Sequence, residues 1–318
     1  MSDPSNRNGG FPGHPGRDRR LNHSFEIHPE ASAILNCSER GLSEFVLNAI
    51  QQHDRLLRSK CGAIRKDAPE SAVTLVHIPG FPVICVKEFR WRGWLHALKG
   101  LFRPTQGLRT YRNGLQLAQK GISCASPLAL VRKGFLGIVQ GEWVIMEVIP
   151  GGLELDRYIT QRIALGWTPD ERKGLARLFG RFIGSIHSLG VFHSDLKTCN
   201  IVASWDGSSP HDDPDASADD PPSSSWSSVR FSLLDYDDVT FSSEVSTKRR
   251  TRNLVQIFLS TPAAVRAPQR MLFLDEYALH AGLSRNQKRE IAQEVVKAVQ
   301  GKDLLYVGPD GDIREKWD

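Results

Sequence analysis

The side chains best suited to chemistry lie in one short stretch, residues 193–200, which reads HSDLKTCN. The carboxylate of Asp195 can orient a hydroxyl group and accept its proton, and Lys197 can stabilise negative charge on a group in transfer. Asn200 offers a neutral amide oxygen, a ligand that Mg²⁺ and other hard cations accept. These residue types in this order predict the transfer of a phosphoryl group to a hydroxyl acceptor.

A second carboxylate follows at a matching spacing. Asp235 ends an apolar run 40 residues after Asp195, and 23 of these residues, 206–228, form a low-complexity insertion. The remaining 17 residues are close to the usual separation of the catalytic and metal-binding aspartates of kinases, whose catalytic loop reads H-x-D-x-x-x-x-N. Asp235 and Asn200 are therefore predicted to bind Mg²⁺, and His193 is expected to brace the loop.

A lysine upstream completes the predicted nucleotide site. Residues 83–87 (VICVK) place Lys87 at the end of a strand, as the V-A-I-K element of kinases does. Lys87 is predicted to hold the α- and β-phosphates of ATP, and Glu147 and Val148 to contact the nucleotide just before the interruption at 150–152. Taken singly, each of these side chains also fits a plain structural role. The predicted cofactors are ATP and Mg²⁺, bound by Lys87, Glu147, Val148, Asn200 and Asp235.

The elements that must position these residues predict an α+β fold of the two-lobed, protein-kinase-like type. Residues 24–150 read as a nucleotide-binding N-lobe, with an antiparallel sheet and one main helix, and residues 151–318 as a larger, mostly helical C-lobe. The N-lobe elements are predicted as helices over 42–52 and 107–120 and as strands over 56–64, 73–78, 83–89, 128–131 and 142–148.

The strongest helix signal of the C-lobe follows Thr168. Pro169 suits the first helical position and Glu171 completes a capping box, after which an apolar stripe runs to about residue 189. A strand is predicted over 200–205 and a second one ending at Asp235. Ser284 is predicted to cap another helix.

Composition sets the outer limits. The chain has 318 residues, of which 40% are hydrophobic and 24% charged, and a net charge of +5, as in an ordinary globular protein. The apolar runs are shorter than the roughly 20 residues of a membrane-spanning helix. Residues 1–23 are predicted to be a disordered basic tail without signal-peptide features, so the chain is expected in the cytoplasm. The insertion 206–228, with 8 Ser, 4 Pro and 6 Asp, is predicted to be disordered, and the five cysteines to be reduced thiols.

One segment has an unusual charge pattern. From Phe89 to Gly141 there are nine Lys or Arg and no Asp or Glu, and aromatic residues are interleaved near its start. This pattern predicts that residues 89–112 contact an anionic membrane surface or glycolipid; the alternative is that the aromatics fill the N-lobe core and the cations form a solvated face. The helix over 107–120 also lacks the glutamate that pairs with the strand lysine in most kinases, for which Asn113 or Gln116 could substitute.

Three segments together resemble the lipopolysaccharide kinase family, which includes bacterial Kdo kinases and heptose kinases. They are FRPTQGLRTYRNGLQLAQKGISCASPLAL, the HSDLKTCN loop and LLDYDDVTF, and the resemblance covers about residues 55–300. It implies a kinase-like fold, ATP with Mg²⁺, and as acceptor a hydroxyl of an inner-core sugar on a lipid A precursor, at the cytoplasmic membrane face. The chain departs from the kinase pattern at Asp235-Tyr236-Asp237, where kinases have D-F-G, and near Gly62, where no full glycine-rich loop is present.

Other functions stay open at this point. Lys197 is the residue that protein Ser/Thr kinases use, although no A-P-E element follows Asp235. The missing acidic partner for Lys87 would also suit a catalytically weak pseudokinase scaffold. A nucleic-acid binder could use the cationic segment, but the chain has no motif of that class, so no nucleic-acid partner is expected.

A second basic cluster follows the predicted metal-binding aspartate, where an acceptor would approach. It consists of Lys248, Arg249, Arg250 and Arg252. These side chains could hold acidic head groups, or they could simply form the exposed start of a helix.

Overall fold

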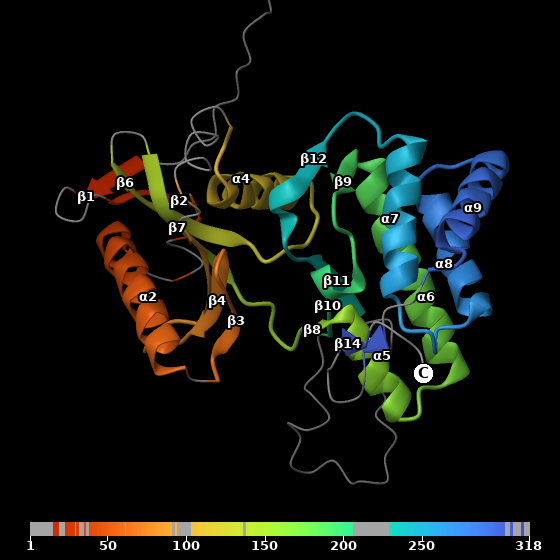
Figure 1. Cartoon of the computed structure of the whole chain (residues 1–318), viewed down its shortest axis with the longest axis horizontal. Coiled ribbons are helices and arrows are strands. Elements are labelled where there is room, and N and C mark those ends of the chain that lie inside the picture. Colours follow the sequence, from red (N-terminus) through yellow and green to blue (C-terminus); the bar gives the residue numbers. More distant parts are fainter. Residues whose placement is uncertain are drawn as a thin grey trace, which may run out of the picture. The chain divides into compact units, whose positions relative to one another are not determined.

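The computed structural model describes most of the chain, as two compact units (Figure 1). Unit 1 comprises Met1–Arg112 with Ser126–Val148, and unit 2 comprises Asn113–Ala125 with Ile149–Asp318. The described residues are 15–18, 23–28, 30–31, 35, 38–60, 62–90, 93, 103–135, 138–205, 229–302, 306–307 and 313–314.

Unit 1 is built on a seven-stranded sheet in which every neighbouring pair is antiparallel. The strand order is β1-β2-β6-β7-β5-β4-β3. The strands are β1 (Pro15–Asp18), β2 (His23–Ile27), β3 (Ile64–Ala68), β4 (Ser71–Val76), β5 (Ile84–Arg90), β6 (Pro127–Phe135) and β7 (Ile138–Glu147). Strand β1 falls within the segment 1–23 that composition marks as a tail.

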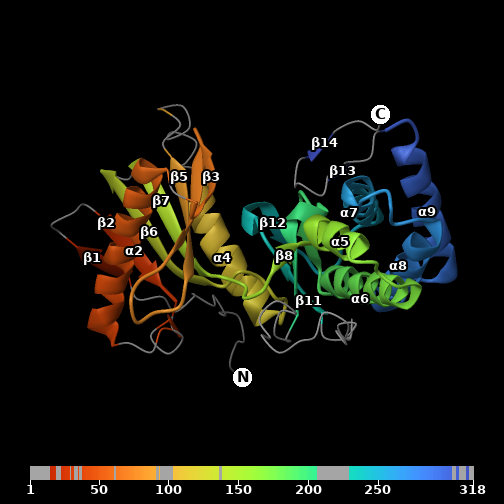
Figure 2. The same ribbon diagram turned by 90° about the horizontal axis from the view of Figure 1, so that it is seen from below.

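Helix α2 (Glu39–Ser59) covers one face of this sheet (Figure 2). Its apolar side, which includes Phe45, Val46 and Ala49, forms a core with alternate residues of the strands, among them Val86 and Ile145. The helix is longer than the predicted 42–52. The strand predicted over 56–64 is therefore wrong except at Ile64, where β3 begins. Residues 56–59 are helical, because Leu56 continues the apolar side of the helix and packs against the same core, and residues 60, 62 and 63 form a turn.

Helix α4 (Gln106–Gln119) confirms the helix predicted over 107–120 and contributes residues to both units. Its N-terminus is held by Glu142 of β7, a side chain with 4% exposure. The Gly107 amide donates to the Glu142 carboxylate at 2.9 Å, and the Thr105 hydroxyl donates to the other oxygen. Burial raises the pKa of Glu142 above its usual value. The first carboxylate after the acid-free segment thus accepts from one N–H group of the first helical turn and from the hydroxyl just before the helix.

Unit 2 is mostly helical. Its helices are α5 (Leu155–Ala164), α6 (Pro169–Ser188), α7 (Thr247–Ser260), α8 (Ala267–His280) and α9 (Arg285–Val299). Three small sheets are formed by β8 (Leu153–Glu154), β10 (Ile201–Trp205) and β11 (Val229–Leu233), by β9 (Val191–His193) and β12 (Val239–Phe241), and by β13 (Tyr306–Val307) and β14 (Ile313–Arg314).

The capping boxes predicted at two helix starts are confirmed. Thr168 and Glu171 exchange hydrogen bonds at the start of α6, and Ser284 and Gln287 do the same at the start of α9. Such boxes satisfy otherwise unpaired N–H groups of the first helical turn. The predicted α+β fold class, an antiparallel sheet unit and a mostly helical unit, is confirmed.

Several predicted segments fall wholly or partly outside the described residues. These are the insertion 206–228, most of the tail 1–23, and residues 91–102 except Gly93 in the cationic segment 89–112. The disordered insertion and the membrane-contacting segment therefore stay predictions. Among the described helices, none combines the length and the apolar character needed to cross a membrane.

Candidate active site

The loop 193–200 begins from a tight turn after α6. Gly190, with φ +74°, precedes β9, and its carbonyl accepts a hydrogen bond from the Ser242 amide at 2.9 Å. A Cβ atom at this position would lie 1.8 Å from the Ser242 carbonyl oxygen. Only glycine fits this backbone and this approach, so Gly190 fixes where the loop begins.

His193 braces the loop, as the sequence predicts. Its Nδ1 accepts from the Asp195 amide at 3.2 Å, so Nε2 carries the proton and donates to the Leu234 carbonyl at 3.0 Å. The ring is 1% exposed, and burial lowers its pKa, which keeps it neutral. A neutral His193 thus ties the backbone before Asp195 to the backbone before Asp235.

Asp195 lies between a cation and an amide. The Lys197 ammonium is 3.0 Å from one carboxylate oxygen, and the Asn200 amide nitrogen donates to the Asp195 carbonyl at 2.8 Å and to the other carboxylate oxygen at 3.3 Å. The Asp195 and Lys197 side chains are 48% and 42% exposed, so both are accessible to a substrate. Because Asn200 uses its nitrogen for these bonds, its carbonyl oxygen is the atom suited to a metal ion.

Asp235 is attached to the same loop. The Leu234 amide donates to the Asn200 carbonyl at 2.9 Å, which sets the two predicted Mg²⁺ ligands on neighbouring segments. Asp235 is exposed and has a left-handed backbone (φ 50°, ψ 46°), a conformation that concentrates at functional sites when the residue is not glycine.

The chemistry of this donor set fits Mg²⁺. One carboxylate and one amide oxygen are hard ligands, and Mg²⁺ in kinases takes its remaining ligands from phosphates and water. Within the described residues no three His, Cys, Asp or Glu side chains form a metal cluster. The Mg²⁺ site stays a prediction, in which Asn200 and Asp235 would supply the protein ligands.

Helix α7 holds the loop from behind through one polar stripe. The Asn253 amide donates to the His193 carbonyl at 2.6 Å. Gln256 accepts from the Leu196 amide at 3.1 Å and donates to the Ser194 carbonyl at 2.8 Å. Ser260 completes the stripe, because its hydroxyl and carbonyl bind Thr198 at 2.9 and 2.7 Å.

Asn253 is in turn bound by buried residues of two other helices. His187 of α6 donates from Nε2 to the Asn253 side-chain oxygen at 3.1 Å, and its Nδ1 meets the Tyr277 hydroxyl of α8 at 2.9 Å. Burial lowers the pKa of His187 to about 4, so the ring stays neutral. This network was not predicted from the sequence. The available signal was the recurrence of polar residues at 253, 256 and 260 on one side of α7, whose second half is mostly apolar.

Asn113 has a role that the sequence did not indicate, and its pairing with Lys87 stays a prediction. Its amide donates to the carbonyls of Tyr236, Asp237 and Val239 at 2.9, 3.0 and 3.3 Å, so it holds the turn after Asp235. Tyr236 is 1% exposed, and its hydroxyl donates to the Ala125 carbonyl. The tyrosine that replaces the phenylalanine of D-F-G is therefore a buried anchor of the same turn.

Lys87, Glu147 and Val148 belong to unit 1. Lys87 is half-buried on β5, with its ammonium 5.1 Å from the centroid of the Phe89 ring. Its neighbour Glu88 points to the opposite sheet face, where it binds Arg90. Glu147 and Val148 are half-buried at the end of β7. The structure joins Asp195, Lys197, Asn200 and Asp235 within unit 2, and their meeting with the unit 1 residues stays a prediction.

The cysteine within the loop is not a reactive thiol by its surroundings. Burial raises the pKa of the Cys199 thiol to about 11, so little thiolate forms at neutral pH. Among the described residues, Cys85 and Cys199 are free thiols.

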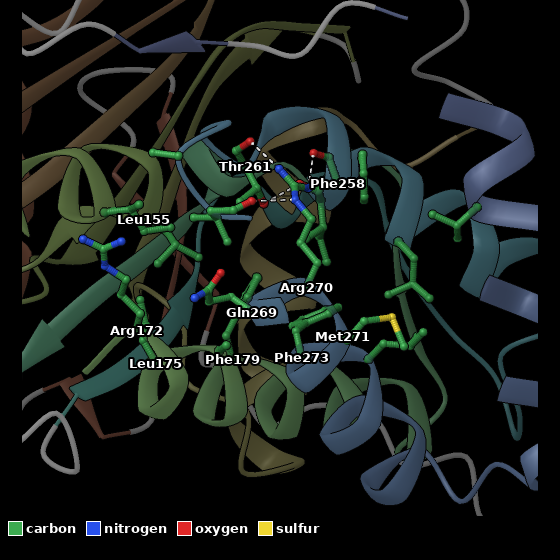
Figure 3. Close-up of a pocket in the computed structure, with 18 of the residues that line it drawn as sticks. Leu155, Arg172, Leu175, Phe179, Phe258, Thr261, Gln269, Arg270, Met271 and Phe273 are labelled. Carbon is green, nitrogen blue, oxygen red and sulfur yellow. Dashed lines mark hydrogen bonds between the residues drawn. The ribbon is translucent and has the colours of Figure 1, made fainter. Parts of the chain in front are cut away.

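A cavity of about 160 Å³ lies elsewhere in unit 2 (Figure 3). Helix α7 lines it with Leu254, Ile257 and Phe258. These apolar residues lie next to the polar stripe of α7 that binds the loop 193–200. The Arg270 guanidinium at its wall donates to the Phe258, Thr261 and Val265 carbonyls, so its N–H groups serve the backbone. None of the predicted site residues lines this cavity.

Comparison with known proteins gives likeness in fold alone. No protein-family model matches the chain, and no curated protein matches it. Among solved structures, one described as WaaP in complex with acyl carrier protein matches with 16% identity and a TM-score of 0.47, over 76% of this chain and 91% of that one. The Toxoplasma gondii specific rhoptry antigen kinase domain matches with 12% identity and a TM-score of 0.41, over 75% and 82%. At these TM-scores and identities, the chemistry of the site is argued only from the residues described above.

Proposed function

We propose that this chain is an ATP-dependent phosphotransferase that phosphorylates a sugar hydroxyl of the lipopolysaccharide inner core, on Kdo or heptose, at the cytoplasmic face of the membrane. One observation carries the proposal: Asp195 lies between the Lys197 ammonium and the Asn200 amide, in a loop bonded to the segment that bears Asp235. A base, a cation and two hard metal ligands are the groups that phosphoryl transfer requires.

Each side chain has a distinct task in this reaction. Asp195 orients the acceptor hydroxyl, whose oxygen attacks the γ-phosphorus while the bond to the bridging oxygen of ADP breaks; the hydroxyl proton passes to Asp195 late in the step. Lys197 lies near enough to Asp195 to stabilise charge on the transferring group. Asn200 and Asp235 would hold Mg²⁺, which neutralises phosphate charge, and Lys87 would hold the α- and β-phosphates.

The short link between Asp235 and α7 favours a small acceptor over a peptide. It spans only residues 236–246, and a 3₁₀ turn and strand β12 account for half of it. Protein kinases place an activation loop and an A-P-E element in this part of the chain. Neither is present here, and the resemblance to lipopolysaccharide kinases supplies the sugar as the acceptor class.

The direct test is phosphate transfer from radiolabelled ATP by the full-length chain. Acceptors are a lipid A precursor carrying inner-core sugars and, in parallel, a generic Ser/Thr-rich protein. We expect transfer to the glycolipid, and a loss of roughly 10²–10⁴-fold in kcat for Asp195→Asn. Asp170→Asn, which changes an 88% exposed carboxylate on α6, is the matched control and should keep full activity.

A protein Ser/Thr kinase is the second candidate, and the Lys197–Asp195 contact favours it. Transfer to the protein acceptor without transfer to the glycolipid would replace the proposed function by this one. A scaffold without turnover would transfer to neither acceptor. In that case ATP would stabilise the protein equally with and without Mg²⁺, whereas the proposed enzyme gains Mg²⁺-dependent stabilisation that Asp235→Asn removes.

A further inference from the structure

The basic cluster at the start of α7 divides into two parts. Arg250 is only 5% exposed, and its Nε donates to the Val245 carbonyl at 2.8 Å, so it is a structural residue. Lys248, Arg249 and Arg252 are exposed. Three accessible cations therefore remain on the surface of unit 2 at this point.

Two of these cations are fixed beside the candidate active site. The guanidinium carbons of Arg249 and Arg252 lie 4.9 and 5.9 Å from the centroid of one ring, that of the buried Phe192. Arg252 donates to the Ser194 carbonyl at 3.0 Å, and Ser194 immediately precedes Asp195. Stacking on an aromatic ring holds a guanidinium in place and leaves its remaining N–H groups available as hydrogen-bond donors.

The charge of this pair is not balanced by a carboxylate of the described residues. Arg249 and Arg252 bind neutral oxygens, the Thr240 hydroxyl at 3.3 Å and the Ser194 carbonyl. Other arginines of the chain contact carboxylates directly, among them Arg90, Arg132, Arg157, Arg162 and Arg181. Two adjacent guanidiniums with unused donors form a site for an oxyanion, which they can bind through paired hydrogen bonds.

We propose that Arg249 and Arg252 bind an acidic group of the acceptor, a carboxylate or a phosphate monoester, and so place its hydroxyl beside Asp195. This inference rests on the proposed phosphotransferase function and adds a rule of specificity to it. Acceptors with an oxyanion near the reacting hydroxyl are selected over neutral sugars. Lys248, on the same exposed turn, adds attraction for the anion at longer range.

The kinetic test uses Arg249→Gln in the full-length chain. We expect the KM for the glycolipid to rise roughly 10- to 100-fold, because a charge-assisted hydrogen-bond pair is lost, while the KM for ATP stays unchanged. The matched control is Arg177→Gln, which removes the same charge from the exposed side of α6, where Arg177 is 4.0 Å from Glu276. An equal rise in KM for the control, or no rise for Arg249→Gln, would overturn the inference while leaving the phosphotransferase function intact.

A binding measurement separates this inference from the proposed function and identifies the source of the anion. Free Kdo, its uncharged methyl ester and inorganic phosphate are titrated against wild type and Arg249→Gln by ligand-observed NMR. Weaker binding of Kdo by the variant, with little binding of the ester, supports a carboxylate; weaker binding of phosphate alone supports a phosphate monoester. Equal affinities in the two proteins, or a wild type that binds neither anion, contradict the inference even if phosphate transfer is observed.

Discussion

Replacing Asn253 by leucine tests whether α7 holds the loop 193–200. Asn253 is fully buried and binds both the His193 carbonyl and the His187 Nε2 hydrogen. Leucine is close in size but satisfies neither group. Each buried polar group left without a partner costs about 1–3 kcal/mol, so we expect a loss of about 2–6 kcal/mol in the free energy of unfolding.

The substitution should also displace the backbone of the loop 193–200. Without the bond to the His193 carbonyl, the bonds from α7 to the loop that remain are those of Arg252, Gln256 and Ser260. Misplacement by about 1 Å can reduce turnover by 10²-fold, so we expect kcat to fall by roughly tenfold or more. Urea unfolding followed by circular dichroism and steady-state phosphate transfer are the two measurements. Gln293→Leu, on the exposed side of α9, is the matched control and should stay within about 0.5 kcal/mol of wild type.

A double-mutant cycle with His187→Leu makes the test specific. Because the bond between His187 and Asn253 can be lost only once, the double variant should be destabilised by about 1 kcal/mol less than the sum of the two single changes. Strict additivity, or an Asn253→Leu variant within about 1 kcal/mol of wild type with normal kcat, would refute the assigned role of α7.

Three further predictions concern the frame around the site. Burial lowers the pKa of His187 to about 4, so folding favours the neutral ring. The contribution of His187 to the free energy of unfolding is therefore fully present above pH 6.5 and falls by about 3 kcal/mol on acidification to pH 4. Urea unfolding of His187→Leu should lack this pH dependence. Gly190→Ala should lower stability by about 3 kcal/mol or more and reduce phosphate transfer, because its Cβ would meet the Ser242 carbonyl oxygen; a normal melting temperature would contradict this. Glu142→Ala should cost about 1–3 kcal/mol and increase hydrogen exchange at Gly107, whose amide loses its acceptor, whereas unchanged exchange would show that Glu142 does not cap α4.

Local signals in the sequence were sufficient where the interactions themselves are local. The capping box at Thr168 places the start of α6, and the loop at 193–200 follows that helix as expected. A short apolar run does not distinguish a strand from the last turn of a helix, which is why residues 56–59 were predicted wrongly. Only the packing of Leu56 on the core decides that case.

Most residues that support the site could not be identified from spacing. Asn113 is separated from Tyr236 by more than a hundred residues, and its contact depends on the fold that brings α4 to this turn. Asn253 has the same difficulty, because an asparagine in a helix is usually a surface residue. The contacts of Asp195 with Lys197 and Asn200 are local in sequence, so residue order could indicate them, whereas their roles in phosphoryl transfer stay predictions.

Because Asn113 of α4 binds three backbone carbonyls of the turn after Asp235, a change in that turn should also affect α4. A helix is stiff along its axis, so the second half of α4 and the turn 236–239 must shift together or break these bonds. Any ligand that orders the Asp235 side chain should then slow the exchange of amide hydrogens along residues 113–119. Nucleotide binding at one carboxylate would become visible in a segment more than a hundred residues earlier in the chain.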